Sequence, residues 1–445
     1  MTHEEPFGLP RDLGDGLTLR WATPDDAEAV AQFNLAMHSD PPGEETFLYH
    51  WTHDLMRGDH PTTKASDFTV VTDTDGRIIS SLNLISQTWA YDGIPFAVGR
   101  PELVATLPEY RRRGLVRQQM ALIHQKSAAR GELVQAITGI PWYYRQFGYE
   151  MGLDLGGGRQ LFWARPGNDE KVETEPYQVR PATADDIPVL QELYTAHLGR
   201  SLIARLRTPE LWRYEMFGSH PESLWTLKLK MVLTPDDEVV GYVNYEPFGT
   251  AIAIAELGVR PGHSWRSVGR FLVRYLREEA AVLNATRAAD KQLTNLSFNL
   301  GQAHTVYEAL DPDLEKQTRP YAWYVRVPDI PAFLRYIAPA LERQLAGSVM
   351  AGHTGTCKIN LYRSRFMMVW ENGRLTEVTD GYEYERLEEG DARFPDLTFL
   401  QLLFGFRSFE ELLVAFVDCY PSDNTTRVLL RALFPKRPSH VIPLG

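Results

Sequence analysis

Runs of apolar residues long enough for β-strands alternate with amphipathic helical patterns over the first 325 residues of the chain. The first half predicts a strand at 17–21, a helix, antiparallel strands, a second helix and a further strand. The second half repeats this order, beginning with a strand at 177–180. Because helices and antiparallel strands occur together in each half, the pattern predicts two copies of one α+β domain.

A short motif, R-x-A-T-x-D-D, opens both copies; Arg20 begins the first and Arg180 the second. In each copy a strand runs into a threonine, Thr23 or Thr183, that can cap a helix, and two acidic residues follow in the first turn, where the helix dipole favours them. This is common chemistry for a helix start, so the motif could recur by chance. The matching elements that follow each copy favour a true duplication.

Polar residues mark the predicted domain boundaries. The segment 165–176 is rich in charged residues, proline and glycine, which is typical of a linker. We therefore expect a first domain at 1–165, a second at 177–325 and a third at 326–445.

The third region combines a hairpin signal with a late helical pattern. Asn372 and Gly373 separate two strand-like runs, as in a tight β-hairpin. Ser408 and Glu411 form a capping-box pattern at the start of an apolar helix. These features predict a third α+β domain with its helices late in the sequence.

Composition narrows the partners and the compartment. The chain has a formal net charge of −12, which argues against nucleic acid and anionic membrane as partners and is compatible with a cationic small molecule. It has no uninterrupted apolar stretch of transmembrane length, and its first residues lack the pattern of a signal peptide. The two cysteines, Cys357 and Cys419, form neither a metal motif nor a disulfide framework. We expect a cytoplasmic protein without a metal.

Three consecutive arginines, Arg111 to Arg113, stand out against this acidic background because they precede a predicted helix. Positive charge at a helix N-terminus opposes the helix dipole, so a bound anion is a plausible compensation. Gly114 lets the backbone approach such an anion, and the free N–H groups of the first turn can bind phosphate oxygens. The alternative is a solvated basic turn without a ligand.

Two motifs at this position and beyond it resemble those of the GNAT superfamily of N-acetyltransferases. Arg111-x-x-Gly114-x-Val116 resembles the superfamily's pyrophosphate loop, R/Q-x-x-G-x-G/A, although Val116 departs from the last position. After the next predicted strand, Tyr144 and the pair Gly148-Tyr149 resemble its Y-x-x-x-G-F/Y segment.

The resemblance extends to the enhanced intracellular survival (Eis) proteins of bacteria, which are similar in the phrase V-A-T-L-P-E-Y-R-R-R-G-L and in domain order. It implies two tandem GNAT domains followed by a sterol carrier protein-like domain. It also implies acetyl-CoA-dependent N-acetylation of primary amines, which belong to an aminoglycoside-like molecule, a polyamine or a lysine peptide. The enzyme is implied to be a homo-oligomer, a hexamer. No metal is implied.

The resemblance also assigns roles to residues of the first domain. It places the pantetheine arm along one strand and the pyrophosphate on the turn that follows. The pantetheine residues are Leu103, Val104, Ala105 and Thr106, and the pyrophosphate residues are Arg111, Arg112, Arg113, Gly114 and Leu115. Tyr144 corresponds to the general acid that protonates the departing thiolate; a phenol with an ordinary pKa of about 10 can do so. Its alternative is a core aromatic residue.

In this family the catalytic base is the chain's own C-terminal carboxylate, which here belongs to Gly445. This sequence departs from the family pattern, because it ends in glycine and not in an aromatic residue. The apolar tail is expected to lie in a groove, where burial would raise the pKa of the carboxylate. His50, His53 and Asp54 are fallback bases, with surface or capping roles as their alternative.

The remaining parts are predicted to lack this chemistry. The turn of the second domain is longer and less basic, with Arg266 at the start of its R-x-x-G segment, and Tyr307 lacks a following glycine-aromatic pair. In the third domain an apolar cluster suggests a buried interface or a lipid tunnel; its members are Phe399, Leu400, Leu402, Leu403, Phe404 and Phe406.

Two other functions remain open. One is a different acyltransferase, because N-myristoyltransferases and the aminoacyl-transferring Fem enzymes also carry paired units of this fold. The other is a noncatalytic scaffold that binds coenzyme A.

Overall fold

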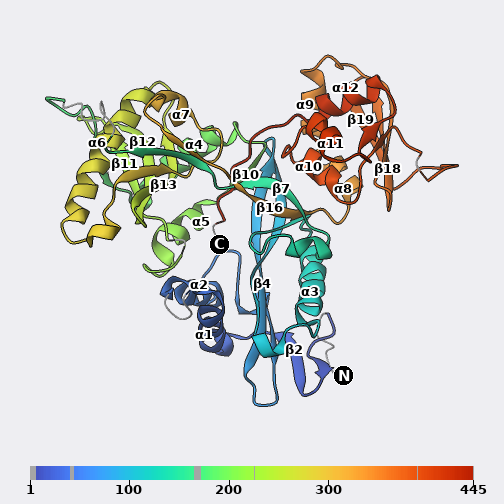
Figure 1. Ribbon diagram of the computed structural model, residues 1–445, viewed down its shortest axis with the longest axis horizontal. Coiled ribbons are helices and arrows are strands. Elements are labelled where there is room, and N and C mark those ends of the chain that lie inside the picture. The colour runs from blue at the N-terminus through green and yellow to red at the C-terminus, as the bar shows by residue number, and fades with distance from the viewer. Residues whose placement is uncertain (1–6, 41–44, 165–171, 225, 388, 444–445) are drawn as a thin grey trace.

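The computed structural model describes residues 7–40, 45–164, 172–224, 226–387 and 389–443, and it arranges them around three β-sheets (Figure 1). The first sheet has nine strands. In sheet order they are β1 Arg11–Gly14, β2 Leu17–Trp21, β3 Phe68–Thr72, β4 Ile78–Tyr91, β5 Ile94–Thr106, β6 Val134–Ile137, β16 Tyr321–Arg326 and β7 Glu150–Leu155, with β10 Ile203–Leu206 paired to β4. Both strands and helices are present in each part of the chain, so the predicted α+β class is confirmed.

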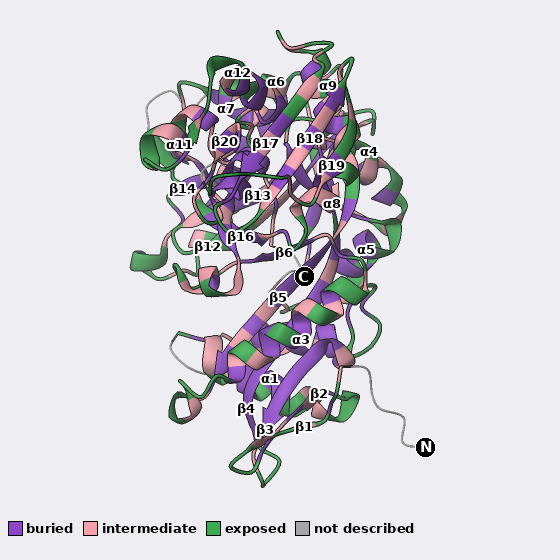
Figure 2. Cartoon of the chain, turned by 90° about the vertical axis from the view of Figure 1, so that its right-hand side faces the viewer, coloured by how far each residue is buried: buried purple, intermediate pink, exposed green. Residues whose placement is uncertain are grey.

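The long antiparallel pair of β4 and β5 forms the centre of the first unit. Its residues are largely buried (Figure 2), because helices cover both faces. Helices α1 (Ala27–His38) and α2 (Thr46–Met56) lie on one side of β4, and α3 (Leu115–Ala129) lies on the other (Figure 1). Met120 and Ile123 of α3 are buried against this sheet.

The second unit repeats the arrangement around a seven-stranded sheet. Its strands, in sheet order, are β15 Lys316–Thr318, β8 Gly158–Phe162, β14 Asn295–Phe298, β13 Ala251–Val259, β12 Val239–Phe248, β11 Leu229–Leu233 and β9 Gln178–Pro181. Its helices are α4 Ile187–Leu198, α5 Pro209–Arg213, α6 Trp265–Asn284 and α7 Thr305–Leu310, with a π-helical turn at Tyr214–Gly218.

The two copies of the repeated motif form the same local structure. The Arg20 guanidinium binds the Asp26 carboxylate at 2.7 Å, and Arg180 binds Asp186 at the same distance. In the first copy the Asp26 carboxylate also accepts hydrogen bonds from the backbone N–H and hydroxyl of Thr23. Each threonine stands in a capping box with the aspartate three residues later, so the predicted cap is present at both helix starts.

Two strands are exchanged between these units. Strand β8 precedes the predicted linker but lies between β14 and β15 of the second sheet. Strand β16, at the end of the second copy, lies between β6 and β7 of the first sheet. The domain boundaries at 165 and 325 stay predictions. Strand β8 precedes the boundary at 165 but completes the second sheet, and β16 follows that boundary but completes the first sheet.

The third unit has a five-stranded sheet with helices packed on it. In sheet order its strands are β19 Arg374–Thr379, β18 Arg365–Glu371, β17 Gly355–Asn360, β20 Ala392–Arg393 and β21 Tyr420–Pro421, and its helices are α8 Ile330–Tyr336, α9 Ala338–Ala346, α10 Thr398–Leu403, α11 Phe409–Ala415 and α12 Asn424–Leu433. The predicted hairpin joins β18 and β19, with Asn372 and Gly373 at positive φ. The predicted capping box of Ser408 and Glu411 is present at α11.

The apolar cluster of the third unit packs into a core that it shares with the first unit. Phe404 stacks on Phe333, whose ring also contacts Tyr91 and Phe96 of the β4–β5 pair. The backbone carbonyl of Leu403 accepts a hydrogen bond from the Tyr91 hydroxyl at 2.8 Å. This packing accounts for the cluster as a buried interface.

Candidate active site

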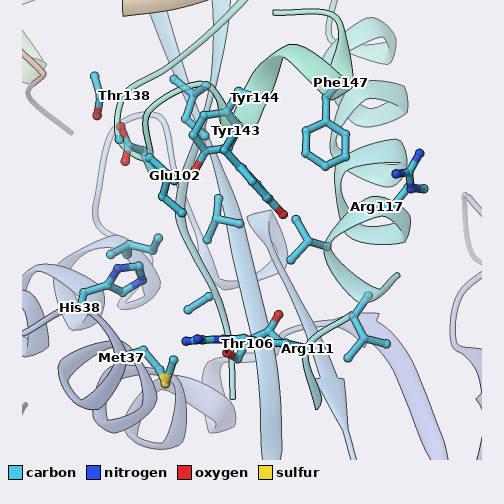
Figure 3. A pocket seen from close by; sticks show the side chains of 18 of the residues that line it. Met37, His38, Glu102, Thr106, Arg111, Arg117, Thr138, Tyr143, Tyr144 and Phe147 are labelled. Atoms are coloured by element: carbon cyan, nitrogen blue, oxygen red, sulfur yellow. Dashed lines mark hydrogen bonds between the residues drawn. The ribbon is translucent and has the colours of Figure 1, made fainter. Parts of the chain in front are cut away.

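A cavity of about 1110 Å³ opens in the first unit where β5 and β6 diverge (Figure 3). It is lined by β5, by the turn and first residues of α3, by the segment after β6, and by α1 and α2 on the opposite side. Its volume exceeds the roughly 300–1,000 Å³ of ordinary small-molecule pockets. The cavity can therefore hold an extended ligand together with a second molecule.

An irregularity in β5 creates this opening. The register between β4 and β5 shifts between Ser81 and Asn83, and Leu103, in the opposing stretch of β5, has a φ of 51°. Strand β5 pairs with β6 only at Val98 and Gly99, so the two parallel strands separate before the bulge. On the side that faces away from β4, the backbone of residues 103–106 consequently lines the cavity, while Ala105 and Thr106 pair with β4 on the other side.

The turn before α3 forms an anion-binding shape. Gly114 has a φ of 76° and precedes the first residue of α3, and Arg112 also has a positive φ of 63°. No side chain accepts a hydrogen bond at this helix start. The N–H groups of the first turn therefore remain suited to an anion, which the helix dipole also attracts.

The arginines of this turn point in different directions. Arg111 and Arg112 line the cavity, and the Arg111 Nε donates a hydrogen bond of 3.2 Å to the Thr106 carbonyl. Arg113 pairs with Asp15 at 2.6 Å and is not among the residues that line the cavity. Arg117, in the first turn of α3, lines it instead. Reasoning from the motif alone missed Arg117, which lies three residues after Gly114 and within the first turn of α3.

Tyr144 reaches the same cavity from the segment after β6. It lies in the short helical turn Tyr143–Phe147, between Trp142 and Gly148, which both have positive φ. The side chain is 3% exposed and lines the cavity beside Tyr143 (Figure 3). Burial raises the pKa of Tyr144, and the nearby Glu102 carboxylate raises it further. The phenol is therefore protonated at neutral pH.

Two titratable residues that the sequence patterns did not single out also line the cavity. Glu102 lies on β5 directly before the bulge, and His38 is the last residue of α1. Burial lowers the pKa of His38, while a hydrogen bond to the backbone of Leu103 opposes this shift. No local motif marks either residue, because only the pairing register and the contact between α1 and β5 bring them together.

The fallback bases do not line the cavity. His50 stacks on His220 of the second unit, with ring centroids 3.7 Å apart, and Asp54 accepts hydrogen bonds from the His220 backbone N–H. His53 lies 3.1 Å from Glu28. These three residues of α2 therefore contact neighbouring parts of the fold, and Asp54 does so from a buried position.

Gly445 lies outside the described residues. The tail before it is packed between the units, as expected for an apolar segment. The Val441 carbonyl accepts a hydrogen bond of 3.0 Å from Trp323 Nε1 on β16, and Ser439 Oγ accepts one of 3.1 Å from the Ile203 N–H on β10. Val441 is 1% exposed.

The corresponding positions of the second unit are occupied by internal contacts. Ser264 caps α6 by accepting a hydrogen bond from the Ser267 N–H at 3.2 Å. The Tyr307 hydroxyl donates to the carbonyls of Phe298 and Gly301 at 3.1 and 3.0 Å. In the described part of the chain, this unit therefore offers neither an open helix start nor an accessible phenol at these positions.

The first unit matches a known protein family. Residues 18–152 match the model of the acetyltransferase (GNAT) domain. The first unit is a GNAT acetyltransferase domain. The chain is accordingly an enzyme of the acetyltransferase class. No curated protein matches this sequence at a significant level.

Several solved structures share the fold over most of the chain. A probable N-acyltransferase from Enterococcus faecalis V583 has 14% identity and a TM-score of 0.68, covering 95% of this chain and 98% of that one. Eis1 from Mycobacterium abscessus has 16% identity and a TM-score of 0.60, covering 95% and 99%. Saccharomyces cerevisiae N-myristoyltransferase with bound myristoyl-CoA has 12% identity and a TM-score of 0.50, covering 72% and 81%.

Two further kinds of feature are missing from the described residues. No helix among them has both the length and the apolar character needed to cross a lipid bilayer. Nor do three or more His, Cys, Asp or Glu side chains gather there in a way that could hold a metal ion.

Proposed function

We propose that this protein transfers the acetyl group of acetyl-CoA to a primary amine of a cationic small molecule, aminoglycoside-like or polyamine, or of a lysine side chain. One observation carries the proposal: within a GNAT domain, the open helix start at Gly114 and the protonated phenol of Tyr144 face one cavity. The first is suited to a pyrophosphate and the second to a departing thiolate.

Acetyl-CoA is the proposed acyl donor, and the residues of the cavity fit it. The backbone edge of residues 103–106 that faces away from β4 runs beside the pantetheine arm. Arg111, Arg112, Gly114 and Leu115 hold the pyrophosphate, with Arg117 as an additional cation. Acetyl-CoA supplies the activated carbonyl, and an N–H of Val104 or Thr106 stabilises the charge that develops on its oxygen. The reaction is a direct transfer without a metal.

Tyr144 is the proposed general acid. Its raised pKa keeps the proton on the phenol until a thiolate is present to accept it. For the proton of the amine, the family resemblance proposes the Gly445 carboxylate. The packing of the tail up to Pro443 against both the first and second units supports a fixed path for this segment.

The remaining proposals concern the rest of the molecule. The second unit is proposed to be a scaffold, which is supported by the internal bonds of Tyr307 and Ser264. The third is proposed to be sterol carrier protein-like, from the sequence resemblance and its α+β build. A homo-oligomer, a hexamer, in the cytoplasm is proposed on the same resemblance; Val414 and Val417, 89% and 92% exposed, are apolar groups available for contacts. Neither nucleic acid nor membrane is a proposed partner.

A longer acyl donor is the second candidate, because a yeast N-myristoyltransferase with bound myristoyl-CoA has a similar fold. Purified protein is incubated with acetyl-, octanoyl- or myristoyl-CoA and a panel of aminoglycosides, polyamines and lysine peptides, and acylated amines are detected by mass spectrometry. Acetylated products support the proposal. Products only with longer donors favour the second candidate, and coenzyme A binding without any product indicates a noncatalytic scaffold.

A further inference from the structure

Strand β16 lies in the sheet of the first unit although it follows the second unit in the sequence. It pairs with β6 on one side and with β7 on the other. Strand β15 ends at Thr318, shortly before β16 begins at Tyr321, and pairs with β8 in the second sheet. The second unit is therefore joined directly to a strand within the sheet of the first.

The loop from β6 to Tyr144 contains a strained turn. The Ile140 carbonyl accepts a hydrogen bond of 3.3 Å from the Tyr143 N–H, and Pro141 and Trp142 occupy the two positions between them. Trp142 has a φ of 65° and a ψ of −8°, which is the third position of a type II turn, where glycine is usual. Backbone strain of this kind persists only where neighbouring groups hold it. The turn therefore needs support from outside the loop.

Tyr324 of β16 gives this support. Its side chain is completely buried, and its hydroxyl accepts a hydrogen bond from the Trp142 N–H and donates one of 3.4 Å to the Ile140 carbonyl. Burial raises the pKa of Tyr324 to about 12, so at neutral pH the hydroxyl keeps the proton that it donates. One hydroxyl thus binds two backbone groups of the same turn.

The position of the Tyr144 side chain depends on these neighbours. In the part of the chain that the structure describes, its hydroxyl has no hydrogen-bond partner, so packing holds the ring. The Tyr324 ring meets it edge to face, with the centroids 5.6 Å apart. A Cβ at Gly139 would lie 3.9 Å from the Tyr144 hydroxyl, and the Gly139 carbonyl accepts a hydrogen bond of 3.3 Å from the Tyr321 hydroxyl. Two tyrosines of β16 therefore fix the ring of Tyr144 and the backbone beside its hydroxyl.

We propose, on the basis of the proposed function, that Tyr324 is a positioning residue, which holds the turn and the Tyr144 ring so that the phenol meets the departing thiolate. Tyr324 itself neither gives nor takes a proton in the reaction. Tyr321 assists through the Gly139 carbonyl. The second unit, proposed above as a scaffold, thus also completes the active site of the first through β16.

The test uses full-length protein and an amine that the wild type acetylates. Tyr324→Phe keeps the ring and removes the hydroxyl. Its control is Tyr91→Phe, because Tyr91 is also completely buried in the first sheet, but its hydroxyl donates to the Leu403 carbonyl and it does not line the cavity. A double variant adds Tyr324→Phe to Tyr144→Phe. For each protein, kcat, the KM for acetyl-CoA and Tm are measured.

The expected losses follow from the indirect role of Tyr324. Tyr324→Phe should lower kcat roughly 10–100-fold, as a displaced catalytic group does. It should leave the KM for acetyl-CoA unchanged, because the turn before α3 is not altered. Tyr91→Phe should lower Tm but keep kcat. In the double variant, Tyr324→Phe should slow the enzyme no further than Tyr144→Phe alone, since residues that act through one step are not additive.

A second variant, Tyr321→Phe, covers the case in which Tyr324→Phe does not fold. It removes the hydrogen bond to the Gly139 carbonyl from an exposed position. We expect kcat to fall about 2–10-fold, as for the loss of one hydrogen bond. An unchanged kcat in Tyr321→Phe, when Tyr324→Phe does not fold, overturns the inference.

The other outcomes separate this inference from the proposed function. An unchanged kcat in Tyr324→Phe, an equal loss in Tyr91→Phe, or a double variant slower than Tyr144→Phe overturns the inference alone. A wild-type protein that acetylates no amine, or a Tyr144→Phe variant with the wild-type rate, overturns the proposed function together with it.

Discussion

The arginines of the loop before α3 differ in what they contact, and this difference is testable. Arg111 lines the cavity, whereas Arg113 pairs with Asp15 outside it. We expect Arg111→Ala to weaken acetyl-CoA binding by about 1.5–3 kcal/mol, the usual loss for hydrogen bonds to a charged group. Arg113→Ala should change binding by less than about 1 kcal/mol, because it removes only a surface ion pair.

Calorimetric titration of both variants with acetyl-CoA, at low and high salt, makes this comparison. Equal losses for the two would mean that Arg113 also binds the pyrophosphate, as the motif alone had suggested. In that case the Arg113–Asp15 pair would have to open when acetyl-CoA binds.

The residues of the site were only partly predictable from sequence. Gly114 and Tyr144 belong to local motifs that resemble those of the GNAT superfamily, and this resemblance predicted that both serve one site. The turn of Arg113 toward Asp15 depends on a residue almost one hundred positions earlier in the chain. Glu102 faces the cavity because of a shift in strand register, which no residue type at that position reveals.

At the level of the secondary-structure element, α3 and its preceding turn carry the proposed binding of pyrophosphate. Gly114 and Gly131 flank this helix at φ angles of 76° and 71°, and an added Cβ would meet nothing within 4 Å at either position. We expect Gly114→Ala and Gly131→Ala each to lower the free energy of unfolding by about 1–2 kcal/mol, the cost of a left-handed non-glycine residue. The two costs should be similar because the strain lies in the backbone alone.

Only the change at Gly114 should raise the KM for acetyl-CoA, since Gly131 lies at the far end of the helix. Thermal unfolding and steady-state kinetics of the two variants measure both effects. A similar rise in KM for both variants would indicate that the helix as a whole, and not its N-terminal turn, controls binding.

Strands were easier to predict than their partners. The strand predicted at 17–21 is the observed β2, and the strand predicted at 177–180 is the observed β9, Gln178–Pro181. The exchange of β8 and β16 between sheets could not be predicted, because each reads as an ordinary strand next to its sequence neighbours. Pairing of this kind is decided by which sheet has an open edge once the chain is folded.

For the whole molecule, the two units share an arrangement but differ at their corresponding helix starts. The first unit keeps an open helix start, whereas α6 of the second is capped by Ser264 and its Tyr307 is bonded to two carbonyls. We therefore expect calorimetry to find one acetyl-CoA per chain. The variant Arg266→Ala alters the corresponding turn of the second unit and should leave this binding unchanged. If the wild type binds a second equivalent of acetyl-CoA and Arg266→Ala loses it, the second unit is not a scaffold.

The central claim is that the cavity of the first unit acetylates amines with Tyr144 as the acid. The most direct measurement is amine-dependent release of thiol from saturating acetyl-CoA by wild type, Tyr144→Phe and the matched variant Tyr307→Phe. We expect Tyr144→Phe to lose about 10²–10⁴-fold in kcat, the usual contribution of a general acid, while Tyr307→Phe keeps the wild-type rate and loses only stability. A wild-type rate in Tyr144→Phe, or no amine-dependent release by the wild type, would contradict the claim.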